Sequence, residues 1–150
     1  MSRNPRIGQL SERRSLLKCA GRFREAIPLQ LEIIELLEEE GETANRLASA
    51  HNMASVLCLG AKLHSSAEWH ARRALELHVD ESAKGYEALG AYQFVMARIL
   101  ASRYEFEDAV EFGEKAISAY ARWHNPQDEF LSGVIGEVEK MRNRTWAAPE

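Results

Sequence analysis

The side chains best suited to metal binding or nucleophilic chemistry are five histidines and two cysteines. Among them, His51 and Cys58 are seven residues apart and could share one face of a helix. A Cys/His metal site needs at least one further converging ligand, and none is evident nearby in the sequence. The chain has no His-Glu-x-x-His motif, and no two histidines are four residues apart. We therefore expect no metal site, and we interpret His51 as a half-buried histidine that faces a neighbouring helix.

Other catalytic patterns are equally weak. A Cys58–His51 nucleophile pair would need an orienting acid and oxyanion donors, and the sequence points to neither. The glycines are scattered, and the phosphate-binding motifs GxGxxG and GxxxxGK are both absent. The sequence therefore predicts a protein that is not an enzyme and uses no cofactor.

The composition is that of a globular protein with one domain. The chain has 150 residues, of which 45% are hydrophobic and 28% charged, and its formal net charge is −4. This charge gives no reason to expect direct binding to nucleic acid. No apolar run approaches the roughly 18 residues that would suggest a membrane span, and the N-terminus has no hydrophobic signal segment. Cys19 and Cys58, without a Cys-x-x-Cys motif, fit buried thiols in a reducing compartment, so we expect a cytoplasmic protein with no membrane attachment.

Small residues recur at helical spacings of four and three in this chain. Two such triplets and one degenerate copy before them follow one another at a period of about 41–42 residues. Self-similarity at a fixed period of this size is typical of stacked supersecondary units. The three copies are Ala26–Gln30–Ile33, Ala67–Ala71–Ala74 and Ala109–Gly113–Ala116.

A strip of small side chains lets two helices approach closely. Larger side chains there would overpack the crossing, which typically costs about 1–3 kcal/mol per site. Phe23 and Phe106 each stand three residues before the alanine of their copy, and His64 takes this place in the middle copy. Each copy therefore opens the second helix of a pair, and each unit is a helix–turn–helix.

The whole chain is predicted to be helical, because strand and hairpin signals are missing. Asn4-Pro5 and Asn125-Pro126 resemble an N-cap followed by proline at the start of a helix. Gly41 is expected to end the second helix. The expected helices span residues 5–20, 23–40, 43–61, 65–79, 81–103, 106–124 and 127–143.

The last of these helices differs from the others. Its apolar residues form one stripe, from Phe130 to Met141, and charged residues lie opposite. This pattern suits a terminal capping helix with a polar outer face. Residues 144–150 are expected to be a frayed tail.

The period, the small residues and the aromatics together resemble the tetratricopeptide repeat (TPR) family over residues 7 to 124. The usual TPR period is shorter, about 34 residues, so the resemblance is to the extended repeats of the kinesin light-chain type. The Trp-x2-Leu-Gly-x2-Tyr signature is largely absent, and HEAT-like helix pairs are the alternative architecture. The resemblance implies a single domain, residues 1–150, folded as a right-handed α-solenoid. Its three helix–turn–helix repeats would span about 5–40, 43–79 and 81–124, with a capping helix at 127–143.

In that family, the first helices of the repeats line a concave groove that holds a peptide or a helix of a partner protein. Asn52 matches the groove asparagine of the family, and Arg98 with Phe94 one turn earlier matches the same face of the third repeat. Lys18 is the corresponding candidate in the first repeat. An asparagine can bond a peptide backbone in both directions, and an arginine can bind a carboxylate with two hydrogen bonds. Each of these residues could instead serve packing or an internal ion pair.

The sequence therefore predicts a protein–protein interaction scaffold that binds a protein or peptide partner. The alternative is a regulatory, effector-sensing domain of a signalling or transcription-control system. Homodimerisation through an exposed helix face is also open.

Overall fold

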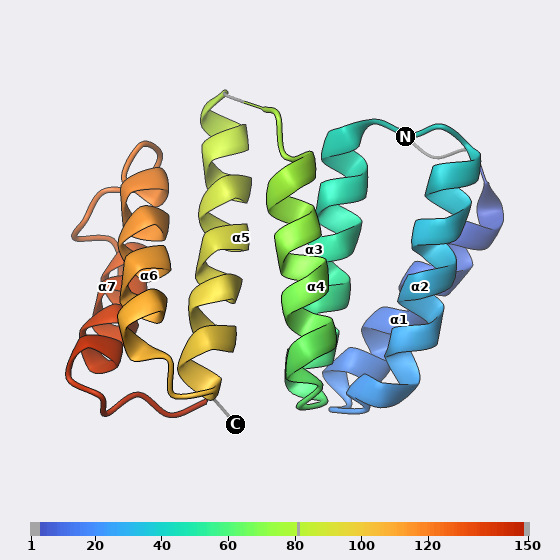
Figure 1. Ribbon diagram of the computed structural model, residues 1–150. Helices are drawn as coiled ribbons and strands as arrows, with labels where there is room; N and C mark the ends of the chain where they lie inside the picture. Colours follow the sequence, from blue (N-terminus) through green and yellow to red (C-terminus); the bar gives the residue numbers. More distant parts are fainter. Residues whose placement is uncertain (1–3, 81, 149–150) are drawn as a thin grey trace. The chain divides into compact units, whose positions relative to one another are not determined.

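The computed structural model describes residues 4–80 and 82–148, and within these ranges it contains seven α-helices and no strand (Figure 1). This confirms the predicted all-α class. Asn4 caps the first helix as predicted, with its Oδ1 accepting a hydrogen bond from the backbone N–H of Arg6 at 2.9 Å. The helices are α1 (Pro5–Cys19), α2 (Phe23–Glu39), α3 (Ala44–Gly60), α4 (His64–Leu77), α5 (Ala83–Ser102), α6 (Phe106–Tyr120) and α7 (Glu129–Arg142).

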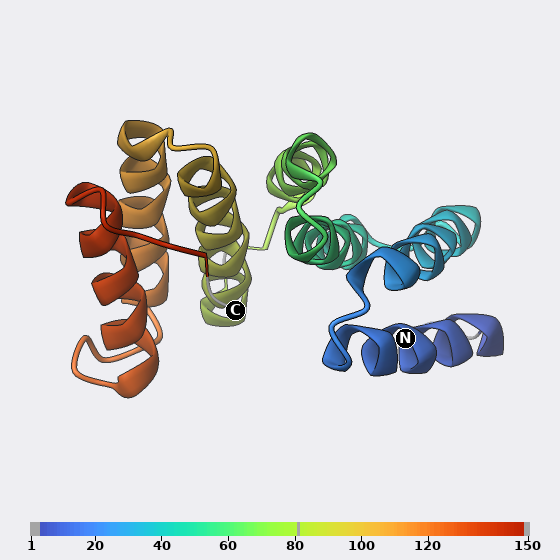
Figure 2. The same ribbon diagram turned by 90° about the horizontal axis from the view of Figure 1, so that it is seen from below.

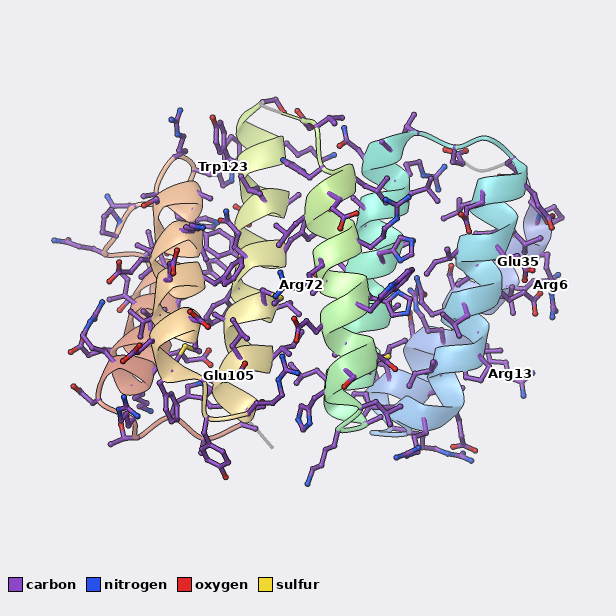
Figure 3. The ribbon with its side chains drawn as sticks, viewed as in Figure 1. Arg6, Arg13, Glu35, Arg72, Glu105 and Trp123 are labelled. Carbon is purple, nitrogen blue, oxygen red and sulfur yellow. The ribbon has the colours of Figure 1, made fainter. Side chains whose placement is uncertain are left out.

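The chain divides into two compact units, Met1–His78 and Val79–Glu150. In the first unit, α2 packs against α1 and α3, and α3 packs against α4. In the second unit, α6 packs against both α5 and α7 (Figures 1 and 2). In Figure 3 the label Glu105 marks the residue just before α6, and Trp123 lies in the loop that follows α6. None of the described helices is both long enough and apolar enough to cross a membrane.

The same turn joins α1 to α2, α3 to α4, and α5 to α6. Each turn contains one residue with positive φ: Gly21 at 74°, Lys62 at 62° and Tyr104 at 62°. The next residue closes a hydrogen bond back across the turn, which is the Schellman motif that ends many helices. These three bonds run from the N–H groups of Arg22, Leu63 and Glu105 to the carbonyl oxygens of Leu17, Cys58 and Leu100. The turn residues follow one another at the same spacing as the alanines Ala26, Ala67 and Ala109.

The alanines that revealed the period are fully buried. Ala26, Ala67 and Ala109 are each the fourth residue of their helix, and each is 0% exposed. Ala71, Ala74 and Ala116 are also 0% exposed, and Gly113 is buried. The small residues were predicted to lie where two helices approach closely, and their burial agrees with that prediction.

Two glycines show how close the helices come. A Cβ added at Gly60 on α3 would lie 2.7 Å from the ring of Phe23 on α2. A Cβ added at Gly113 on α6 would lie 2.6 Å from Cγ2 of Val138 on α7. Both distances are shorter than carbon atoms tolerate, so these contacts need a residue without a side chain.

Gln30 stands where the other two copies have Ala71 and Gly113, and its contacts explain why a larger polar residue is present in the first copy. Its side chain is 1% exposed, and its Nε2 donates to the carbonyl oxygen of Ala50 on α3 at 2.9 Å. Its Oε1 accepts from Nη1 of Arg14 on α1 at 2.7 Å. The amide therefore joins three helices, and both of its ends are satisfied, as a buried polar group requires.

Three local predictions need correction. The last helix begins at Glu129 rather than 127, because Asp128 is its N-cap and accepts from the N–H of Leu131 at 2.7 Å. Asn125 caps a short turn instead, accepting from the N–H of Gln127 at 2.8 Å. Cys19 is exposed rather than buried, whereas Cys58 is buried and its pKa is raised by that burial.

The tail after α7 was expected to be frayed, but residues 144–148, its described part, are held in place. Trp146 is only 9% exposed, and its backbone N–H donates to the carbonyl oxygen of Lys140 at 3.1 Å. A large aromatic side chain that finds a covered site holds the chain after α7 in place. Residues 149 and 150 lie outside the described part of the chain.

Candidate functional site

The four residues predicted to contact a partner are divided between the two units. Lys18 lies in the last turn of α1 and Asn52 lies on α3, so both belong to the first unit. Phe94 and Arg98 lie one turn apart on α5, in the second unit. The structure brings together only Phe94 and Arg98 in direct contact.

Asn52 is half-buried, and its amide is incompletely satisfied. Its Oδ1 is covered and has no hydrogen-bond partner among the described residues. Lys18 is also half-buried, and its position near the helix C-terminus is electrostatically favourable for a cation. The role of both residues in binding remains a prediction.

Arg98 is held on two sides. Its guanidinium carbon lies 4.6 Å from the centre of the Phe94 ring, a cation–π distance. Its Nε and Nη2 bond the two carboxylate oxygens of Glu137 on α7 at 3.2 and 2.6 Å. Glu137 Oε1 also accepts from the indole N–H of Trp146 at 3.1 Å. A partner carboxylate at Arg98 would therefore have to compete with Glu137.

A cluster that the sequence did not predict lies between α3 and α4. His51 Nδ1 and His70 Nδ1 are 3.0 Å apart, within hydrogen-bond distance. The ring of Trp69 meets both imidazoles in an edge-to-face manner, with centres 5.8 Å from His51 and 4.9 Å from His70. His51 is 6% exposed, whereas Trp69 is 59% exposed. His51 thus faces a neighbouring helix as predicted, but it is buried rather than half-buried, and its hydrogen-bond partner is His70.

The position of the α3–α4 turn is the signal that could have revealed this pair. In a helical hairpin, residues at similar distances before and after the turn face each other. The hydroxyl of Ser55 on α3 donates to the carbonyl oxygen of Ala67 on α4 at 2.8 Å, which fixes this register. His51 and His70 follow in the same register, about one turn of helix farther from the hairpin end.

The electrostatic environment keeps both imidazoles neutral. Burial first, and then the neighbouring His70 and Arg73, lowers the pKa of His51 to about 4. Burial also lowers the pKa of His70. At neutral pH one ring therefore donates its Nδ1–H and the other accepts with its Nδ1 lone pair.

His124 in the second unit has the opposite environment. Its Nδ1 lies 2.8 Å from Asp128 Oδ2, and its Nε2 lies 2.7 Å from Glu87 Oε2 on α5. Burial disfavours the charged ring, but hydrogen bonds to both carboxylates raise the pKa of His124 above its usual value. The residue thus connects the α6–α7 loop to α5.

Tyr120 lies beside this group but is a poor acid. Burial first, and then the charge of Glu87, raises the pKa of Tyr120 to about 12. A phenol with this pKa stays protonated at neutral pH, far from the range that suits proton transfer. The His124 group therefore has the properties of a structural connection.

The described residues contain no group of three or more His, Cys, Asp and Glu side chains arranged to hold a metal ion. Neither a scan against protein-family models nor a search among curated proteins finds a match for this chain.

Proposed function

We propose that this protein is a non-enzymatic interaction module of the TPR type, a right-handed solenoid of three helix–turn–helix repeats. The observation that carries the proposal is the Schellman turn that recurs at Gly21, Lys62 and Tyr104. Five residues after each turn residue stands a fully buried alanine. The same turn also ends α2 at Gly41 and α7 at Arg144, without an alanine five residues later. It is therefore the pairing of the turn with a buried alanine at a fixed period that favours repeated units over a helical bundle of unrelated hairpins.

α7 serves as the capping helix in this proposal. It buries Leu131, Val134, Val138 and Met141, each at most 3% exposed, on one side. Its other side carries exposed Ser132, Gly133, Gly136 and Glu139. Two residues of the predicted apolar stripe, Phe130 and Ile135, are not covered and are 46% and 37% exposed. A terminal helix of a repeat array needs this division between a covered apolar face and a solvated face.

The proposed role is binding rather than catalysis. The two histidine groups of the described chain are a neutral pair between helices and a ring held by two carboxylates. Both arrangements serve helix packing as they stand. The unpaired cysteines favour a cytoplasmic location, where thiols stay reduced.

The partner in this proposal is an extended peptide or a helix of another protein, and Asn52 is its main polar contact. A covered carbonyl oxygen without a hydrogen bond is costly, and turning the half-buried amide so that a peptide N–H can reach this oxygen would remove the cost. Arg98 contributes less, because both of its hydrogen-bonding nitrogens on this side are used by Glu137.

The test uses peptides selected on the full chain from a displayed random library. Fluorescence polarisation with labelled peptides then gives the Kd for wild type and variants. Loss of one hydrogen bond in Asn52→Ala is expected to weaken binding about tenfold. Ser49→Ala, an exposed position on the same helix, is the matched control and should leave the Kd unchanged.

Glu137→Gln provides an independent arm of this experiment. It weakens the internal ion pair and makes the guanidinium of Arg98 more accessible, so acidic peptides should bind more tightly. Equal affinity for wild type and Asn52→Ala, or a selection that yields no binding peptide, would reject the proposed binding face.

A further inference from the structure

His124 lies in the loop between α6 and α7, and both of its ring nitrogens contact a carboxylate. Nδ1 lies 2.8 Å from Oδ2 of Asp128, the N-cap of α7, and Nε2 lies 2.7 Å from Oε2 of Glu87 on α5. We propose that His124 is a pH-sensitive switch: its protonated ring connects the α6–α7 loop to α5, and its neutral ring releases Glu87. Neither the sequence analysis nor the proposed interaction function assigns this role.

The number of protons on the ring decides how many of these hydrogen bonds exist. An ionised carboxylate accepts hydrogen bonds and cannot donate them, so each of the two contacts needs an N–H group on the histidine. The imidazolium ion has two N–H groups, and the neutral ring has only one. When His124 loses its proton, one carboxylate therefore faces a nitrogen lone pair at less than 3 Å and is repelled.

The two carboxylates differ in how firmly they are held. Oδ1 of Asp128 accepts from the backbone N–H of Leu131 at 2.7 Å, so this side chain stays at the start of α7 whatever the charge of the histidine. Glu87 comes from another helix, 37 residues away in the sequence, and its side chain is 39% exposed. It can turn into water without breaking a helix cap. The neutral ring therefore keeps its N–H for Asp128 and loses Glu87.

Packing keeps the imidazole in its place during this change. The ring centres of Tyr120 and Phe130 lie 5.9 and 4.8 Å from that of His124. The backbone N–H of His124 also donates to the carbonyl oxygen of Tyr120 at 2.7 Å, which attaches the residue to the end of α6. The histidine would have to give up these contacts to swing away, so the side chain of Glu87 is the one that moves.

The charges that act on the ring come from the two carboxylates that it joins. Burial disfavours the cation, but the hydrogen bonds and charges of Asp128 and Glu87 outweigh burial and raise the pKa of His124. α6 places Tyr120 against the ring, and this phenol, with a pKa of about 12, stays neutral while the histidine titrates. α7 places Phe130 there, which carries no charge. The change of charge that operates the switch is therefore that of His124.

The switch affects stability above the ordinary titration range of histidine. Because the pKa of His124 is raised in the folded chain, the protonated ring stabilises the fold fully below about pH 6.5. This contribution is lost as the pH rises through the raised pKa. The loop then loses this connection to α5, while its bonds to the end of α6 and the start of α7 remain.

The first test is an NMR titration of the full chain, labelled in its histidines, between about pH 5 and pH 9. The spectrum of His124→Gln identifies the signal of His124, whose midpoint should lie above the ordinary value of about 6.5. Glu87→Gln and Asp128→Asn each remove one negative charge and should lower this midpoint. Glu129→Gln, an exposed position next to Asp128, is the matched control and should leave the midpoint unchanged.

Glu87→Gln also separates the switch from the connection itself. An amide both donates and accepts, so it can bond the ring in either charge state. Between about pH 6 and pH 9 the Tm of wild type should fall by about 2–4 °C relative to that of Glu87→Gln. Glu87→Ala, which lacks the connection at every pH, should have a lower Tm at pH 6 and a pH profile parallel to that of Glu87→Gln.

Hydrogen exchange locates the change in the structure. Over the same pH range, the backbone N–H of His124 should exchange increasingly faster in wild type than in Glu87→Gln, whereas that of Leu57 in the first unit should exchange equally in both. Circular dichroism shows whether each variant is folded. A His124 midpoint at or below the ordinary value would overturn the proposal. So would Tm profiles of wild type that run parallel to those of both folded Glu87 variants.

Discussion

Gly113 on α6 is the position where one added carbon should disturb the packing most clearly. A Cβ there would lie 2.6 Å from Cγ2 and 3.1 Å from Cγ1 of Val138. Val138 is 1% exposed, so its side chain has no free space to turn into and α7 would have to shift. Overpacking of this kind costs about 1–3 kcal/mol, while alanine in place of glycine in a helix gains about 0.5–1 kcal/mol.

Urea denaturation followed by circular dichroism measures the free energy of unfolding of Gly113→Ala. Gly136→Ala on α7 is the matched control, because no atom lies within 4 Å of its added Cβ. The control should gain about 0.5–1 kcal/mol, and Gly113→Ala should fall about 1–3 kcal/mol below the control. Val138→Ala removes the colliding carbons but has a cavity cost of its own, so Val138→Ala alone is the reference for the double variant. Gly113→Ala should no longer be destabilising in that background. A Gly113→Ala protein as stable as the control would refute the close-contact argument.

Two further predictions concern single residues. The pKa of His51 is lowered to about 4, so between pH 6.5 and pH 4 the unfolded chain binds a proton at this residue and the folded chain does not. The contribution of His51 to the free energy of unfolding is therefore complete above pH 6.5 and is lost as the pH falls toward 4. Wild type should therefore lose about 2 kcal/mol of unfolding free energy between pH 7.5 and pH 5 relative to His51→Gln, and parallel pH profiles would contradict this. Lys62→Gly should stabilise the protein by about 0.5–1 kcal/mol, because Lys62 has a φ of 62° that glycine adopts without strain. In the same urea assay Gly21→Ala, at a φ of 74° with open space around it, should lose stability, and an unchanged value for both would exclude a backbone effect.

The helix pattern could be predicted because it depends on local signals. Apolar and small residues at helical spacing predicted the bounds of every helix to within about four residues. The largest difference is at the end of α6, which is Tyr120 instead of residue 124. Asn4-Pro5 acts as predicted, but Asn125-Pro126 does not, because Asp128 offers a second cap three residues later. Two possible caps so close together cannot be ranked without knowing which one lets α7 reach α6.

The candidate site was harder to predict because its properties depend on residues far apart in the sequence. Nothing in the neighbourhood of Arg98 indicates that Glu137, 39 residues later, will occupy its guanidinium. The same is true of His51 and His70, which become neighbours only through the register of the α3–α4 hairpin. The residue types made Arg98 and His51 candidates for a functional site, but tertiary packing determined that their partners are Glu137 and His70.

The first copy differs from the others in sequence, and the contacts of Gln30 give a physical reason. Among the described residues, α1 buries Ile7 and Leu10, whereas α3 buries seven residues. Where later copies use Ala71 and Gly113, the first has Gln30, which bonds both α1 and α3. An amide that reaches two helices can hold α1 where little apolar area is covered, because both of its ends are hydrogen-bonded and the residue is 1% exposed. The polar residue in the first copy is therefore explained by the contacts that it makes.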